Sequence, residues 1–477
     1  MRLLEGVIFL IVFFTTVLVL IGDFKRIKIA KYIPIVGFVT FTLHLLIEGK
    51  RWQLYPLYLI IIIYLALSIL KLTGRFSSYK LNNHKIIKGS VIGIMILFLL
   101  VSAMSAYAFP VYKMALPSGK YKIGTVAFDI TDENRKAIYS DNLKNNRKIK
   151  LQVWYPAEDT KGYKQVTWLQ EGDLVANGIS KMMKFPGFLL SHTSLVMSNS
   201  YTNAPISSEK DRYPLVIISH GWTGFRNLHT DVAELLASEG YMVIAIDHTY
   251  GSAVIVFNNG EVEYLNSNAL PKREITPNFL EYANTLVNTY AGDIELTLDT
   301  LEKFNLGDKN PMFKDRLDLT TIGLLGHSTG GGASVITALN DKRIKAVVGL
   351  DAWVEPIKED DIKSGLNVPS LFLRSEEWEN GQNNKNLLLL LDSSKNAREL
   401  YQINGINHLD FSMIYMYSPL TKYFNITGKL DGRVAAQIQQ EFIFKFYEKY
   451  VQNNFNSSDQ EISKKYKEVK LIYSEKK

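Results

Sequence analysis

The residues best suited to chemistry lie in the pentapeptide Gly326-His327-Ser328-Thr329-Gly330, which follows the apolar run from Ile322 to Leu325. A short strand that turns through Gly-x-Ser-x-Gly into a helix is typical of a nucleophile elbow. The glycines allow a turn so tight that the serine takes strained backbone angles and its hydroxyl stands exposed. We therefore interpret Ser328 as a nucleophile. A glycine-rich turn whose serine only caps a helix has the same local pattern.

A serine nucleophile needs a histidine base and a carboxylate that orients it, and on this kind of elbow they follow in the order serine, carboxylate, histidine. His408 is the only histidine after Ser328. Asp351 directly follows an apolar strand expected over residues 344–350, where a carboxylate is partly desolvated and fixed. We therefore predict Asp351 and His408 as partners of Ser328. Glu377 is the reserve carboxylate, and a turn or N-cap is the alternative role of Asp351.

Acyl transfer also requires two backbone N–H groups where negative charge develops. The Thr329 amide directly after the nucleophile is one candidate. The loop after the apolar strand 213–219 should supply the other, with Trp222 as the expected donor. His220 in the same loop is expected to brace it rather than to carry protons.

Four motifs follow one another along the chain: Ser219 to Arg226, Gly326 to Gly331, Gly349 to Trp353 and Asn407 to Phe411. In this order they resemble the motifs of the plasma-type platelet-activating factor acetylhydrolase family and its bacterial relatives, and the resemblance spans about residues 118 to 452. The resemblance implies an α/β-hydrolase fold and calcium-independent hydrolysis of short or oxidised acyl esters on lipids. It also implies a triad of Ser328, Asp351 and His408, with the Trp222 and Thr329 amides as oxyanion donors. Many members have a bulky aromatic residue after the nucleophile and a smaller residue in the oxyanion loop, so the acyl pocket should differ here.

Composition excludes several other classes of function. The chain has no cysteine, which excludes disulfides and thiol catalysis. Its formal net charge of +7 is scattered without a basic stripe, so nucleic acid is not an expected partner. The eight histidines show no metal-ligand spacing. We therefore expect neither a metal nor a cofactor.

Residues 1–112 are predicted to form a membrane module. Its four apolar segments are long enough, or nearly so, to cross a bilayer as helices. A signal peptide is the alternative for the first, and the second is short. Lysine and arginine are concentrated in the first and third connections, which predicts that these loops are cytoplasmic and that both termini and the hydrolase domain lie outside the cell. This predicted orientation holds only if all four segments cross the membrane. The four segments are residues 3–22, 32–47, 54–70 and 89–109.

Residues 113–452 are predicted to form an α/β-hydrolase domain with a mostly parallel twisted sheet and helices on both faces. Two antiparallel strands, 121–128 and 147–155, should begin it. Residues 162–203 are rich in aromatic residues and methionine, and fit a lid, a surface resting on the bilayer or a core-covering helix. Residues 453–477 form a polar, charged tail for which no structure is expected.

These features predict an integral membrane serine esterase whose partner is an ester or lipid substrate. The same machinery would also suit a general carboxylesterase, a polyester hydrolase or an acyltransferase. A different class, a non-catalytic membrane sensor built on a hydrolase fold, stays open because fold alone does not fix activity.

Overall fold

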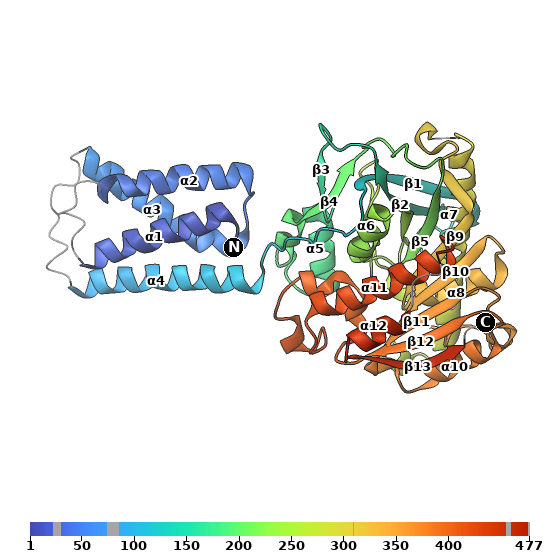
Figure 1. The fold of residues 1–477 in the computed structure, drawn as a ribbon. Helices are drawn as coiled ribbons and strands as arrows, with labels where there is room; N and C mark the ends of the chain where they lie inside the picture. The colour runs from blue at the N-terminus through green and yellow to red at the C-terminus, as the bar shows by residue number, and fades with distance from the viewer. Residues whose placement is uncertain (22–29, 74–84, 309, 455–458, 476–477) are drawn as a thin grey trace.

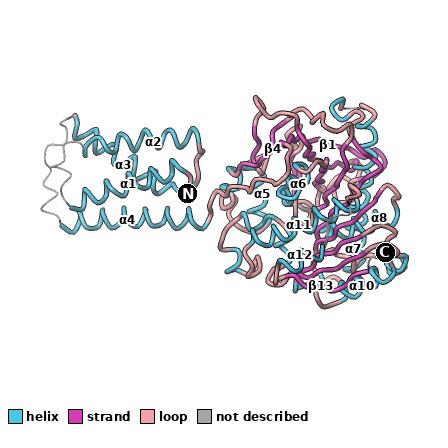
Figure 2. Tube along the Cα trace, viewed as in Figure 1, coloured by secondary structure: helices cyan, strands magenta, loops and turns pink. Residues whose placement is uncertain are grey.

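The computed structural model describes residues 1–21, 30–73, 85–308, 310–454 and 459–475. A bundle of four helices lies beside a larger α/β body, and the N-terminus lies at the end of the bundle closest to that body (Figure 1). Figure 2 shows the strands gathered in this body, with helices on either side of them.

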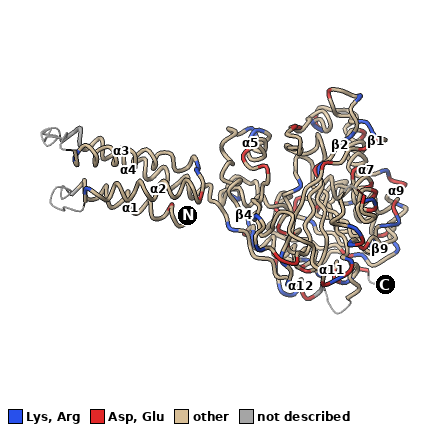
Figure 3. Tube along the Cα trace, turned by 90° about the horizontal axis from the view of Figure 1, so that it is seen from above, with Lys and Arg blue, Asp and Glu red and all other residues tan. Residues whose placement is uncertain are grey.

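The four N-terminal helices are long and apolar enough to cross a membrane. Pro34 and Pro56 stand in the first turns of the second and third helices, where a missing N–H costs no helical hydrogen bond. Figure 3 shows charged residues over the α/β body and near the helix ends, whereas the middle of each helix carries almost none. The predicted set of four apolar helices is therefore present, as α1 (Leu3–Ile21), α2 (Ile33–Ile47), α3 (Tyr55–Leu72) and α4 (Lys85–Ala108).

The α/β body is built on one eleven-stranded sheet in the order β13-β12-β11-β10-β9-β5-β6-β2-β1-β4-β3. Its centre, from β6 to β12, is parallel, and β1 and β2 pair antiparallel as predicted. The mostly parallel α/β fold predicted from the sequence is thus confirmed. The strands are β1 (Lys122–Lys136), β2 (Asn146–Ala157), β3 (Gln165–Thr167), β4 (Met197–Thr202), β5 (Tyr213–Ser219), β6 (Met242–Asp247), β9 (Leu317–His327), β10 (Ile344–Leu350), β11 (Ser370–Ser375), β12 (Arg398–Ile403) and β13 (Val469–Glu475), with β7 (Val254–Val256) and β8 (Val262–Tyr264) in a separate hairpin.

Helices cover both faces of the sheet because successive side chains of a buried strand point to opposite sides. In β5, Leu215 and Ile217 join the core on one face, whereas Val216 and Ile218 join the core on the other. The first face is covered by α7 (Phe279–Asn305), α8 (Thr329–Asn340), α9 (Glu359–Ser364) and α10 (Gln382–Ser393), and the second by α6 (Thr230–Ser238), α11 (Gly432–Tyr450) and α12 (Asp459–Lys465).

The expectation that residues 453–477 lack structure is wrong for their described part. α12 packs on α11 through Ile462, and β13 pairs antiparallel with β12 at the edge of the sheet. Val469 is buried in β13, while Lys470 and Leu471 are exposed. An edge strand gains order from backbone pairing with its neighbour, which a polar composition does not reveal.

Residues 162–203 contribute both to the sheet and to a helical cover. β3 and β4 extend the sheet beyond β1, and α5 (Asp173–Met182) packs into a small separate core with the β7 hairpin and residues 413–417. Trp168 fills the centre of this core and donates through Nε1 to the Asn227 carbonyl over 2.7 Å.

The same segment contacts the end of the four-helix bundle formed by α1 to α4. Trp52 Nε1 donates to the Leu189 carbonyl over 3.2 Å, and its ring centroid lies 5.3 Å from that of Phe188. Phe109, just after α4, packs edge-on against His192. The four-helix bundle thus directly contacts the segment between α5 and β4.

Candidate active site

The turn between β9 and α8 has the strained geometry expected of a nucleophile elbow. Ser328 has φ 53° and ψ −119°, a conformation that L-residues rarely adopt. A Cβ on Gly326 would lie 2.3 Å from the Gly330 carbonyl oxygen, and one on Gly330 would lie 2.1 Å from the Ser219 carbonyl oxygen. The two glycines of the motif are therefore required by close backbone contacts.

The structure brings His408 and Asp351 together. His408 Nδ1 lies 3.0 Å from Asp351 Oδ2, and this carboxylate also accepts hydrogen bonds from the Ser375 amide (2.8 Å) and hydroxyl (2.6 Å). Asp351 is only 1% exposed, so its orientation is fixed. When Nδ1–H donates to this carboxylate, Nε2 carries the lone pair that a general base needs.

Glu377, the reserve carboxylate, has a different position. Its Oε2 accepts the backbone N–H of His408 over 2.8 Å, and no bond from Glu377 to the imidazole nitrogens occurs in the described residues. In the described residues, Asp351 and not Glu377 is therefore the carboxylate that contacts an imidazole nitrogen of His408, and the role of Asp351 in a triad stays a prediction.

Trp222 and Thr329, whose amides are predicted as oxyanion donors, line the same pocket as Ser328. A Cβ on Gly221 would lie 2.9 Å from Ser328 Cβ, which shows how closely the loop after β5 approaches the elbow. Within the described part of the chain, neither the Trp222 nor the Thr329 amide donates to a protein acceptor. An oxyanion hole requires two unpaired N–H groups beside the nucleophile, so both amides are available for this predicted role.

His220 braces this loop, as expected. Its Nδ1–H donates to the Gly221 carbonyl over 2.7 Å, and Nε2 accepts from the Ser252 hydroxyl over 2.8 Å. Burial, with the neighbouring His248, lowers the pKa of His220 to about 3. The ring is therefore neutral at physiological pH, with one donating and one accepting nitrogen.

A second Ser-His-Asp arrangement is buried at the end of β5, and it was not predicted from the sequence. His248 Nε2 lies 2.8 Å from Ser219 Oγ, and His248 Nδ1 lies 2.9 Å from Asp293 Oδ2. All three side chains are 0% exposed, and Arg147 pairs with the Asp293 carboxylate over 2.5 Å. Substrate cannot reach this group, which instead holds the end of β5. No sequence motif predicts this group, because Ser219 ends β5, His248 directly follows β6 and Asp293 lies in α7.

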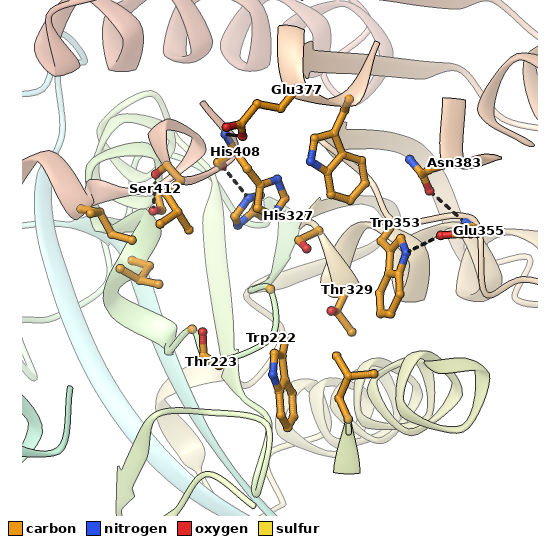
Figure 4. A pocket seen from close by; sticks show the side chains of 18 of the residues that line it. Trp222, Thr223, His327, Thr329, Trp353, Glu355, Glu377, Asn383, His408 and Ser412 are labelled. Atoms are coloured by element: carbon orange, nitrogen blue, oxygen red, sulfur yellow. Dashed lines mark hydrogen bonds between the residues drawn. The ribbon is translucent and has the colours of Figure 1, made fainter. Parts of the chain in front are cut away.

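Ser328, His408, Trp222 and Thr329 line one pocket with a volume of about 670 Å³ (Figure 4). Its other walls are mainly apolar, which suits an acyl chain. Two of these wall residues belong to the segment 162–203. The apolar residues are Met182, Met183, Phe225, Leu228, Leu270, Phe279, Trp353, Trp378, Leu409, Ile414 and Tyr417.

One group of potential metal ligands occurs among the described residues, in the membrane module. Ligand atoms of Glu5, His44 and Glu48 lie within 4.8 Å of one another. Glu5 already pairs with Arg2 (2.7 Å) and Arg51 (3.1 Å), and His44 with Glu48 (2.9 Å). These pairs satisfy the carboxylates without an added cation, so we assign no metal here. The expectation of no metal and no cofactor stays a prediction.

A mostly parallel sheet that presents a serine at a strained strand–helix turn defines the class of the protein as an α/β-hydrolase. The sequence model of the family described as platelet-activating factor acetylhydrolase, isoform II, matches residues 107–469. The chain therefore belongs to this family, and it is a carboxylic ester hydrolase.

Individual relatives agree with this assignment. The platelet-activating factor acetylhydrolase of Canis lupus familiaris is 26% identical over 328 residues, which cover 64% of this chain and 72% of the relative. That of Bos taurus is 24% identical over 371 residues, which cover 73% and 80%. A solved ferulic acid esterase from Streptomyces cinnamoneus superposes with a TM-score of 0.59 at 20% identity, over 76% of this chain and 100% of the esterase. This last likeness concerns the fold.

Proposed function

We propose that the chain is a membrane-anchored serine esterase that removes short or oxidised acyl groups from phospholipids. The observation that carries this proposal is the hydrogen bond between His408 and Asp351 in the same pocket as Ser328 on its elbow. A carboxylate-oriented histidine beside a strained serine serves acyl transfer.

In the proposed reaction, His408 Nε2 takes the proton of Ser328 while Oγ attacks the ester carbonyl carbon. The Trp222 and Thr329 amides donate to the oxyanion, and Asp351 stabilises the imidazolium. The intermediate collapses as His408 returns the proton to the leaving alcohol. Water, deprotonated by His408, then attacks the acyl-enzyme and releases the acid.

Three features support a lipid ester as the substrate. Relatives in the family are named for the hydrolysis of platelet-activating factor. The pocket has mainly apolar walls. Four apolar helices also join the segment whose Met182 and Met183 line this pocket, which would hold the active site close to a bilayer.

The proposed location is the outer face of the cell membrane. The connections that contain Lys25 to Lys31 and Lys71 to Lys88 are rich in lysine and arginine, and such loops remain in the cytoplasm. With four spans, the α/β body then lies outside.

The substrate is tested with the full-length chain in detergent. We expect hydrolysis of p-nitrophenyl esters from C2 to C12 to be confined to short chains and unaffected by EDTA. Phosphatidylcholine with an sn-2 acetyl group should be cleaved much faster than its long-chain counterpart. A preference for long acyl chains, or transfer of the acyl group to an added alcohol in place of water, would contradict the proposed activity.

A further inference from the structure

Three consecutive residues after β11 each contact the loop that carries His408. They form the short 3-10 turn η10 (Glu376–Trp378). Glu376 Oε2 accepts the N–H of Gly405 over 2.8 Å, and Glu377 Oε2 accepts the N–H of His408 over 2.8 Å. The Trp378 ring stacks on the imidazole of His408, with centroids 4.7 Å apart and planes 10° apart. One turn thus holds the histidine loop by two backbone amides and one ring face.

His327 holds the same histidine from another side. Its Nε2–H donates to the His408 carbonyl over 3.1 Å, and the two ring centroids are 4.6 Å apart. Burial, together with the nearby His408, lowers the pKa of His327 well below its usual range, so this ring is neutral. Figure 4 shows Glu377 and His327 on different sides of His408. With Asp351 at Nδ1, the histidine is fixed at its amide, carbonyl, ring nitrogen and ring plane.

We propose that Glu377 and Trp378 are positioning residues for the reaction, and that η10 acts as a clamp on the His408 loop. This inference rests on the proposed function of His408 as the base. The loop leaves β12 through Asn404 and Gly405, where Gly405 has φ 79°, and it is anchored in the core by the buried Ile406 and Phe411. The His408 side chain between these anchors is still 23% exposed. In the proposed reaction, His408 must nevertheless exchange a proton with Ser328, with the leaving alcohol and with water in turn.

The Asp351 hydrogen bond fixes only one ring atom, so small changes in χ1 and χ2 can still tilt the imidazole plane about the line from Nδ1 to Oδ2. The parallel Trp378 ring removes this freedom, because rotation would break the stack. An indole face also favours the imidazolium that forms in each half of the reaction. A small misplacement of a catalytic group costs one to two orders of magnitude in rate, which sets the scale of the expected effect.

The clamp can be tested without disturbing the core. Glu377 is exposed and Trp378 is partly exposed, so their truncation opens no buried cavity. Glu377→Ala and Trp378→Ala should each lower kcat about 10-fold, with KM within about twofold of the wild type. The rate of reaction with a serine-directed phosphonate should fall in parallel. Thermal unfolding should move by only a few degrees.

Conservative variants separate positioning from a merely structural role. Glu377→Gln keeps a carbonyl oxygen that accepts the His408 N–H, and Trp378→Phe keeps an aromatic ring. Both should recover most of the lost kcat. Glu379→Ala is the matched control, because Glu379 belongs to the same exposed stretch and its carboxylate lies 4.0 Å from Arg374. It should leave kcat unchanged.

The clamp is overturned if either alanine variant keeps the wild-type kcat, or if glutamine and phenylalanine lose as much as alanine. A rise in KM at constant kcat would also overturn it, since this places the residue in substrate binding instead. All these outcomes presuppose an active wild type. A wild-type chain that neither turns over esters nor reacts with the phosphonate would refute the proposed function itself, and the clamp with it.

Discussion

His408 Nδ1 lies 3.0 Å from Asp351 Oδ2, although the two residues are 57 positions apart in the chain. Asp351 stands at the end of β10, and its carboxylate is held by Ser375 at the end of the adjacent strand β11. The carboxyl ends of parallel strands meet at one edge of the sheet, so distant residues converge on the pocket there.

We expect Asp351→Asn to lower kcat for p-nitrophenyl acetate at least about 1,000-fold, because the amide does not hold the required histidine tautomer or stabilise the imidazolium. The isosteric change should leave thermal unfolding nearly unchanged. A loss of less than about 10-fold would remove Asp351 from the proposed triad.

The sequence predicted this site because each partner has a local signal. Ser328 lies in a Gly-x-Ser-x-Gly turn, Asp351 follows an apolar strand, and His408 is the only histidine after the serine. The contacts made by Glu377 and Trp378 have no such signal, because they depend on how two loops at the sheet edge approach each other. The paired strand β13 was missed for a related reason, since its order comes from pairing with β12.

The buried group of Ser219, His248 and Asp293 should matter for the oxyanion hole. We predict that Ser219→Ala lowers kcat about 10-fold while KM stays within about twofold, because the hydroxyl fixes the strand end that leads to Trp222. Affinity for a trifluoromethyl ketone, which mimics the tetrahedral state, should fall in proportion.

Ser394→Ala is the control for this effect, because it removes another buried, hydrogen-bonded hydroxyl. The Ser394 hydroxyl accepts from the Leu366 amide and donates to the Leu390 carbonyl, away from the pocket. It should change the melting temperature without changing kcat. Equal kcat and inhibitor affinity in Ser219→Ala and the wild type would refute the bracing role.

Acid should weaken the attachment of the segment 162–203 to the body. Burial opposes the ionisation of Glu171, but the charges of Arg226 and Lys150 outweigh it and lower its pKa from 4.5 to about 2. A carboxylate with a lowered folded-state pKa contributes stability that is present above pH 4.5 and is lost as the pH falls toward 2.

We therefore expect Glu171→Gln to melt at a lower temperature than the wild type at pH 7. This difference should shrink steadily below about pH 4.5 in thermal scans followed by intrinsic fluorescence. Glu281→Gln, at an exposed site on α7, serves as the control and should match the wild type throughout. A difference for Glu171→Gln that stays constant with pH would contradict this assignment.

Because the chain has no cysteine, a single introduced cysteine can report on which side of the membrane its part of the chain lies. We predict that Asn142→Cys, on the exposed surface of the α/β body, reacts with a membrane-impermeant maleimide in intact cells. Ser77→Cys, in the basic connection between the third and fourth spans, should react only after lysis. The reverse pattern would place the hydrolase in the cytoplasm.

The central claim is that Ser328 is the nucleophile, and covalent labelling tests it most directly. The full-length chain is treated with a fluorophosphonate, and the modified peptide is located by mass spectrometry. We predict one phosphonylated residue, Ser328, with no labelling of a folded Ser328→Ala variant and much slower labelling of His408→Ala. Modification of another serine, or undiminished labelling and ester turnover in Ser328→Ala, would contradict the account.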